Sequence, residues 1–148
     1  MATRSIIAKL DDKGVQAIYC HNDGYLSNNG KILDQHYADE DKVNELLAHG
    51  DVSTLDENIG EKINFDDIEL RNTNHQCIFY SRDRGEKQST REPIILEDDI
   101  ALVEFANNAC DAQYVYMYAF GAWYVYCMAE DNQFAELDDV LSKVYNER

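Results

Sequence analysis

Two side chains in this sequence stand at a spacing that suits acid–base chemistry, namely His21 and Asp23. Residues two apart in a strand face the same side, so the Asp23 carboxylate could orient the His21 imidazole as a general base. Their neighbours, Asn22 and Gly24, instead favour a turn, in which the Asp23 carboxylate accepts hydrogen bonds from backbone amides two residues on. We favour the turn, and ligand binding and catalysis stay open as alternatives.

A second histidine, His36, lies near the end of a predicted helix. A protonated histidine at a helix C-terminus is stabilised by the helix dipole, which is a sufficient structural reason for its presence. The functional alternative is a polar ligand pocket lined by His21, His36 and Tyr25. The sequence contains no nucleophile-elbow, phosphate-loop or zinc-hydrolase motif. We therefore assign no catalytic residue and predict that the chain is not an enzyme.

Two arginines stand close together in the stretch Arg82-Asp83-Arg84-Gly85-Glu86, in a chain otherwise dominated by carboxylates. Two guanidinium groups that follow a strand could hold a phosphate or a carboxylate through paired hydrogen bonds. The structural interpretation, which we favour, is that they pair with acidic side chains of the chain itself. An anion-binding site at Arg82 and Arg84 stays open.

The four cysteines stand far apart and form no Cys-x-x-Cys pair. Cys20, Cys77 and Cys127 lie in or beside apolar runs, which predicts buried, reduced thiols that pack as small hydrophobic side chains. The four histidines and four cysteines never fall at the spacing of zinc ligands, so we predict no metal and no other cofactor. This cysteine usage indicates a reducing, intracellular setting.

The elements that must position these side chains are read from apolar spacing and from turn residues. Two apolar runs on either side of Asp11-Asp12-Lys13-Gly14 predict a hairpin. The predicted elements are strands at 4–10 and 15–21, helices at 31–37 and 39–50, one or two helical turns within 51–70, a strand at 75–81, a helix opening at 97–99, a hairpin at 112–128 and a helix at 134–145.

The aromatic hairpin gives the strongest local signal. Tyrosines alternate with apolar residues up to Phe120-Gly121, and a second β-rich run follows. A turn at Phe120-Gly121 places Tyr118 opposite Trp123 and Tyr116 opposite Val125. The residues that then share one face are Tyr114, Tyr116, Tyr118 and Trp123. Helices packed over this face are the favoured explanation, because the basic groove that accompanies base stacking is missing. A tyrosine-rich protein interface is the alternative.

Together these elements predict an α+β fold. We expect an antiparallel sheet of about five strands, mostly in hairpins, with three or four helices packed mainly on one face. The 148 residues include one proline, no Gly/Ser linker and no internal repeat, so a single domain over residues 1–148 is expected.

The charge of the chain excludes several partners. With 13 basic and 29 acidic residues the formal net charge is −16, which disfavours direct binding of nucleic acid or of anionic membranes. No apolar run is long enough to span a membrane, and the N-terminal residues show no secretory signal. The carboxylates fall into groups, which are Asp39-Glu40-Asp41, Asp66-Asp67, Glu97-Asp98-Asp99 and Asp138-Asp139.

Several segments carry a resemblance to known proteins. They are Ile18 to Tyr25 (IYCHNDGY), Gly30 to Tyr37 (GKILDQHY), Lys42 to Leu55 (KVNELLAHGDVSTL) and Phe79 to Glu86 (FYSRDRGE). The pattern resembles that of a widespread family of small acidic bacteriophage accessory proteins that have no assigned activity. The chain departs from it at Asn22, where relatives often carry an aromatic residue, and at Leu26, where many carry proline. The resemblance implies an accessory protein that acts in the cytoplasm of a bacterial host.

Three functions follow from these observations. The first is a non-enzymatic protein that binds and inhibits a host protein with a basic surface, for host takeover or against host defence, through grouped carboxylates that imitate the charge of DNA. The second is a binder that sequesters a nucleotide immune signal, with Arg82 and Arg84 on the phosphates and His21 on the base. The third is a nucleotide or phosphoester hydrolase. The sequence does not indicate the oligomeric state.

Overall fold

The first two strands of the computed structural model form the hairpin that the polar turn predicts. β1 (Ser5–Asp11) pairs antiparallel with β2 (Gly14–Cys20) over their full length. The backbone N–H of Lys13 donates to the Asp11 carboxylate, and Gly14 adopts a φ of +119° that other residues disfavour. The structure describes residues 3–62, 75–85, 92–129 and 133–145.

The aromatic hairpin has the predicted register. β6 (Tyr114–Ala119) and β7 (Ala122–Cys127) pair antiparallel around the two-residue turn at Phe120 and Gly121. The opposed residues are Tyr118 with Trp123 and Tyr116 with Val125, as the alternation of the sequence indicates.

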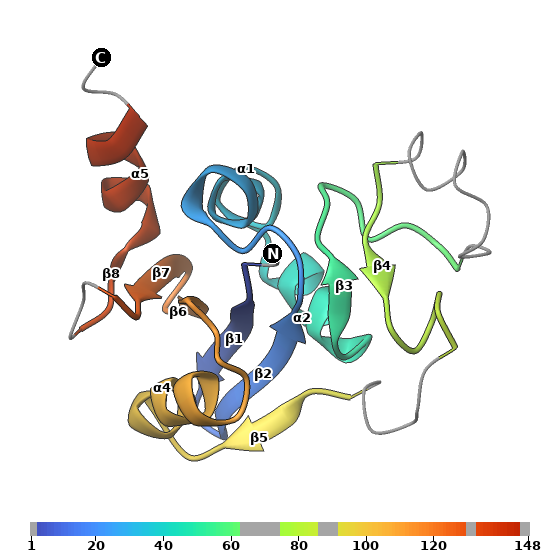
Figure 1. Cartoon of the computed structure of the whole chain (residues 1–148), viewed down its shortest axis with the longest axis horizontal. Helices are drawn as coiled ribbons and strands as arrows, with labels where there is room; N and C mark the ends of the chain where they lie inside the picture. Colours follow the sequence, from blue (N-terminus) through green and yellow to red (C-terminus); the bar gives the residue numbers. More distant parts are fainter. Residues whose placement is uncertain (1–2, 63–74, 86–91, 130–132, 146–148) are drawn as a thin grey trace.

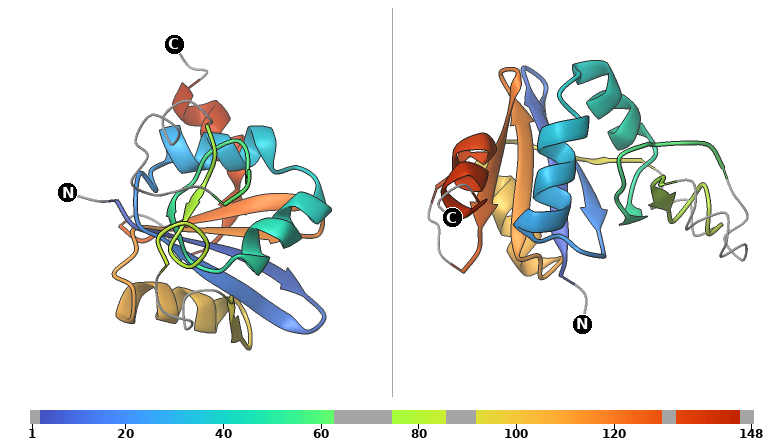
Figure 2. Two further views of the ribbon diagram at one scale, coloured as in Figure 1. Left: turned by 90° about the vertical axis from the view of Figure 1, so that its right-hand side faces the viewer. Right: turned by 90° about the horizontal axis from the view of Figure 1, so that it is seen from above.

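The two hairpins lie side by side because β1 pairs in parallel with β6, from Ser5 opposite Tyr114 to Lys9 opposite Tyr118. Parallel neighbours run in the same direction, so the turns at residues 11–14 and 119–122 lie at the same end of the sheet. We call this the turn end. The left view of Figure 2 shows both turns there, together with the starts of α2 (Glu40–Ala48) and α4 (Asp99–Asn108).

Four short strands complete the sheet. Its order is β4-β3-β2-β1-β6-β7-β8, with β5 also paired to β2. β3 runs parallel to β2 beside Cys20, and β5 runs antiparallel to β2 nearer the turn end. The bounds of these strands are β3 (Val52–Thr54), β4 (Ile78–Phe79), β5 (Ile94–Leu96) and β8 (Ala135–Glu136).

Most helices cover one face of the sheet. A π-helical turn, η1 (Leu26–Gly30), leads into α1 (Lys31–His36) and α2 (Glu40–Ala48), and α5 (Leu137–Tyr145) follows β8. Their apolar side chains share one core cluster with the inward residues of the strands. Figure 1 shows α1 and α2 on this side of the sheet.

The opposite face carries one helix among the described residues, α4 (Asp99–Asn108). Leu102 and Ala106 of this helix pack on Ile6, Ala8 and other small or β-branched residues of β1, β2 and β6 in a second core cluster. Successive strand residues alternate between the two clusters, which is the period expected for a sheet buried on both faces.

The α+β fold and the placement of helices mainly on one face are confirmed, with two differences in the sheet. The described residues form eight strands instead of about five, and the sheet is mixed, because β1–β6 and β2–β3 are parallel pairs. The additional strands are two or three residues long, too short for a readable alternation. The predicted strand at 75–81 is reduced to Ile78–Phe79. The helical turns predicted within 51–70 are absent from residues 51–62, because Val52–Thr54 pair with β2 and β4 as a strand, and residues 63–70 lie outside the described residues.

No helix in the described ranges is both long and apolar enough to cross a membrane.

Candidate functional site

His21 and Asp23 follow the end of β2 but have different neighbours. The Nδ1 of His21 lies 2.7 Å from the hydroxyl of Tyr19, whose pKa burial raises to about 12. Asp23 adopts a left-handed φ of +55°, but the hydrogen bonds of the described residues do not include the predicted one from a backbone N–H to its carboxylate. Its carboxylate lies near the hydroxyl of Tyr25, and that charge raises the Tyr25 pKa. The structure thus pairs His21 with a tyrosine in place of the carboxylate that a catalytic dyad requires.

His36 lies in another environment. Its Nε2 is 3.5 Å from a carboxylate oxygen of Glu57, and its backbone carbonyl accepts a hydrogen bond from Lys42. Tyr25 lines a separate hollow together with Gln113 and residues of the β6–β7 edge. The contacts of the described residues therefore do not bring His21, His36 and Tyr25 into one pocket.

Arg82 has a structural role. Its Nε–H donates across 3.0 Å to the buried carboxylate of Asp83, and its terminal nitrogens donate to the backbone carbonyls of Ile59, Gly60 and Cys77. The side chain is 12% exposed and that of Asp83 is fully buried. This is the internal pairing expected from the sequence, and it directs the Arg82 guanidinium into the protein.

Arg84, two residues on, lies at the surface. Its guanidinium stacks over the ring of Tyr80 at 4.9 Å, and one terminal nitrogen donates to the hydroxyl of Ser53. The two arginines therefore differ in exposure and in their partners.

The aromatic face of the β6–β7 hairpin is covered by helices, as predicted. Tyr116, Tyr118 and Trp123 are buried. The Tyr116 hydroxyl donates to the carbonyl of Gly24, and the Trp123 indole N–H donates to the carbonyl of Tyr37. These rings are therefore closed to bases and to protein partners.

The thiols are free, and three of the four are buried. Burial raises the pKa of Cys20 to about 12, which keeps this thiol protonated and unreactive. Within the described part of the chain, histidine, cysteine and acidic side chains form no cluster that could hold a metal ion.

Two of the predicted acidic groups meet at the turn end. Asp39 caps the start of α2 by accepting the N–H of Asp41, and Glu40 forms an ion pair of 3.1 Å with Lys9 of β1. Carboxylates stabilise helix N-termini, so the helix supplies a local reason for this group.

The second group reaches the turn end from the α4 side of the sheet. β5 pairs with the start of β2, and the backbone oxygens of Leu96 and Glu97 lie beside Gly14 in the first hairpin turn. α4 then begins, and Asp98 caps it by accepting the N–H of Ala101. The groups at 39–41 and 97–99 thus approach one end of the sheet from opposite faces.

The first hairpin turn lies between them and adds two carboxylates, Asp11 and Asp12. The sequence marks these residues only as part of a turn, and their contribution depends on the β1–β6 and β2–β5 pairings. We call the resulting surface the acidic turn end, and its carboxylates are Asp11, Asp12, Asp39, Glu40, Asp41, Glu97, Asp98 and Asp99.

The remaining predicted acidic residues lie elsewhere. Asp138 and Asp139 are exposed in the first turn of α5, and Asp138 contributes, after burial, to a raised pKa at Asp34 of α1. Asp66 and Asp67 lie outside the described residues.

A phenylalanine projects from the acidic turn end. Phe120 is 90% exposed, and it lines a hollow of about 520 Å³ together with Asp11, Asp12 and Glu40. With Gly121 it forms a hairpin turn in which both residues have positive φ, +54° and +79°. Such turns favour Asn-Gly. The Phe-Gly pair is the sequence signal by which this residue could have been found.

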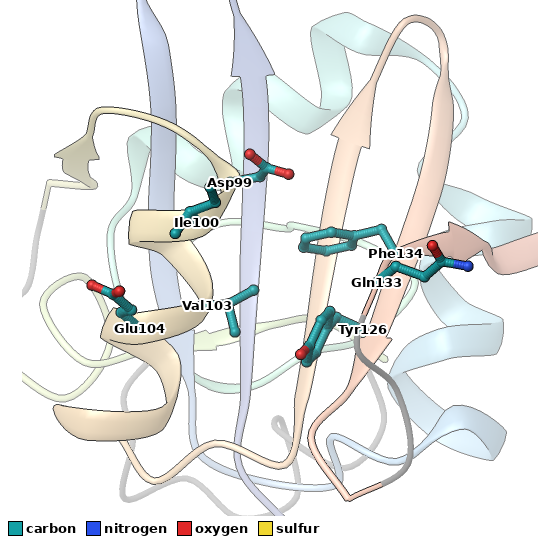
Figure 3. A pocket seen from close by; sticks show the side chains of 7 residues that line it. All are labelled: Asp99, Ile100, Val103, Glu104, Tyr126, Gln133 and Phe134. Atoms are coloured by element: carbon teal, nitrogen blue, oxygen red, sulfur yellow. The ribbon is translucent and has the colours of Figure 1, made fainter.

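An apolar groove continues from the acidic turn end along α4. It has a volume of about 500 Å³ and runs between this helix and the β7–β8 region. Figure 3 shows the rings of Tyr126 and Phe134 facing Val103 of the helix. Asp99 and the largely exposed Ile100 stand at its upper end, so carboxylates and apolar side chains are neighbours here too.

No family model, curated protein or solved structure matches this chain.

Proposed function

We propose that the chain is a non-enzymatic binding protein that docks its acidic turn end on a basic surface of a partner protein. The observation that carries this proposal is the position of Phe120, which is an exposed aromatic side chain that shares a hollow with the carboxylates of Asp11, Asp12 and Glu40. Solubility alone explains grouped carboxylates but gives no reason for such an anchor.

The local structure opposes phenylalanine at this position. A residue with a side chain pays roughly 1–2 kcal/mol for the left-handed conformation, and asparagine or glycine tolerates it better. At 90% exposure the ring gains little from burial within this chain. A large aromatic side chain that is central in an interface is, in contrast, a frequent source of binding energy.

The carboxylates define the chemistry of the partner. A surface rich in negative charge attracts a basic surface and speeds its association, and salt weakens this attraction. Nucleic-acid sites of proteins are basic for the same reason, because DNA presents closely spaced negative charges. The partner proposed here therefore has a basic groove, with an apolar recess that accepts Phe120.

The resemblance of the segments around Ile18 to Tyr25 to phage accessory proteins extends this proposal to the setting. The partner would be a protein of a bacterial host, and occupation of its nucleic-acid site would inhibit it. Sequestration of a nucleotide has less support, because Arg82 is committed to Asp83 and the backbone.

A pull-down from bacterial lysate at two salt concentrations, read by mass spectrometry, tests the proposal. The bait carries Phe120→Ala together with Asp11→Asn and Asp12→Asn, and it is compared with the unaltered chain. The matched control carries Asp138→Asn and Asp139→Asn, which removes the same charge from α5. We expect the first variant to lose a salt-sensitive partner that the control retains. Equal loss in both variants would contradict the proposal, as would retention in both.

A further inference from the structure

A separate hollow of about 360 Å³ lies on the α4 side of the sheet, away from the turn end. The end of β2, the start of β5 and the C-terminal end of α4 form its walls. Its apolar lining comes from Ala17, Ile94, Phe105 and Ala109, and its polar lining comes from Arg4, Tyr19, Asp51 and Cys110.

Arg4, which lines this hollow, carries a hydrogen-bond donor without a partner. Its Nε is buried and has no acceptor in the described protein. One terminal nitrogen lies 3.6 Å from Asp111, whose side chain is 91% exposed, so this ion pair is long and surrounded by solvent. Buried donors in proteins nearly always have a partner, and each exception requires an explanation.

Asp51 brings the complementary group. One carboxylate oxygen accepts the backbone N–H of Tyr19 across 2.9 Å, and burial raises the pKa of this carboxyl group. Neither Arg4 nor any other described cation forms an ion pair with it, although Arg4 lines the same hollow. A carboxylate that forms no ion pair with a described cation and a guanidinium held only by its long ion pair with Asp111 among the described residues therefore line one hollow.

We propose that this hollow binds a small molecule that offers a carbonyl or carboxylate oxygen to Arg4, an N–H donor to Asp51 and an apolar body to Phe105 and Ile94. The volume lies at the low end for ligand pockets, so it suits a free amino acid with an apolar side chain or a nucleoside. Asp51 disfavours a phosphate, because the carboxylate repels a second anion.

Ligand-observed NMR titrations with matched probes test this chemistry. In the first arm, L-phenylalanine is compared with 3-phenylpropionate, which lacks the ammonium group, and with phenethylamine, which lacks the carboxylate. In the second arm, uridine is compared with 3-methyluridine, which lacks the N–H donor but keeps both carbonyl groups. We expect saturable binding of L-phenylalanine or of uridine, and at least about tenfold weaker binding of the analogues of that probe.

Variants of the protein locate the site. Arg4→Gln removes the guanidinium and is expected to weaken binding of the probe at least about tenfold. Lys13→Gln makes the same change of charge in the exposed first hairpin turn and is expected to leave binding unchanged. Thermal melts of both variants verify that they fold. If Arg4→Gln does not fold, Arg4→Lys serves as a second substitution.

Binding of L-phenylalanine alone identifies the amino-acid source, and binding of uridine alone identifies the nucleoside source. The proposal is overturned if neither probe saturates below about 10 mM, which corresponds to negligible affinity. It is also overturned if Arg4→Gln binds as tightly as Lys13→Gln. These results do not depend on the protein partner proposed for the turn end.

Discussion

The guanidinium of Arg82 faces the carboxylate of Asp83, its neighbour in the chain, with the Nε–H donating across 3.0 Å. The same carboxylate accepts the backbone N–H of Phe79 at the end of β4. Arg82 also holds the carbonyls of Ile59 and Gly60, so this pair joins β4 to the segment that follows β3. The arginine-rich stretch is therefore a support of the sheet edge.

Replacement of Arg82 by alanine is expected to lower the free energy of unfolding by about 3–5 kcal/mol, because it leaves the Asp83 carboxylate buried without its cation. Arg84→Ala removes an exposed cation and is expected to cost no more than about 1 kcal/mol. Urea denaturation of both variants measures the difference. Equal losses would refute the structural role assigned to Arg82.

Gly24, in the loop that follows β2, is required for close packing. A Cβ at this position would lie 2.7 Å from the Cβ of Ser5 and 2.8 Å from the carbonyl oxygen of Thr3. Gly24→Ala is expected to destabilise the protein by about 1–3 kcal/mol through this overlap. Gly30→Ala meets only ordinary contacts at 3.5 Å or more and is the matched control. A Gly24→Ala protein as stable as the Gly30→Ala protein would show that the segment at Thr3 moves away freely.

Asp51 makes stability depend on pH. Burial raises its pKa above the ordinary value of 3.8, so the folded state holds the proton more tightly than the unfolded state. The resulting cost of the ionised form is absent below that ordinary value and grows as the pH rises through it. Asp51→Asn keeps an oxygen for the Tyr19 N–H and is expected to raise the melting temperature at pH 7 but not at pH 3.

The exposed Asp12→Asn variant controls for the general effect of removing one negative charge. Melting curves at both pH values decide the question. A gain from Asp51→Asn that equals the gain from Asp12→Asn at pH 7 would contradict the assigned cost of burial.

Substitutions of Phe120 are expected to affect the stability of the protein and the binding of its partner differently. Phe120→Asn is expected to raise the free energy of unfolding by roughly 1 kcal/mol, because asparagine tolerates a φ of +54°. Phe120→Ala keeps the unfavourable backbone and is expected to leave stability nearly unchanged. Both substitutions are expected to weaken binding of the partner that the unaltered chain captures. If Phe120→Asn keeps full binding, the ring is not the anchor.

Local patterns predicted the parts of the fold that depend on neighbours in the sequence. The register of Tyr118 with Trp123 follows from a turn at a glycine, and the helix starts near residue 39 and within 97–99 follow from acidic residues before apolar spacing. The parallel pairing of β1 with β6 joins residues more than a hundred positions apart, and no local pattern encodes it. The mixed character of the sheet was therefore not predicted.

The same distinction applies to the candidate sites. The acidic groups at 39–41 and 97–99 could be read from the sequence. Their common position at the turn end depends on the pairing of β5 with β2 and of β6 with β1. Arg4 and Asp51 belong to no motif, and the fold alone brings them to one hollow. Arg82 was visible as a cation, whereas its burial against Asp83 depends on the path of the chain after β3.

The parallel contact between β1 and β6 also sets an order of events during synthesis. β1 leaves the ribosome early, but its second neighbour is translated only when residues 114–119 have been made. Until then one edge of the nascent hairpin has unsatisfied backbone groups, and such edges attract other chains. Contacts of long sequence separation also slow folding. A ribosome-bound fragment that stops before residue 114 is thus expected to depend on chaperones, whereas one that includes the second hairpin is not.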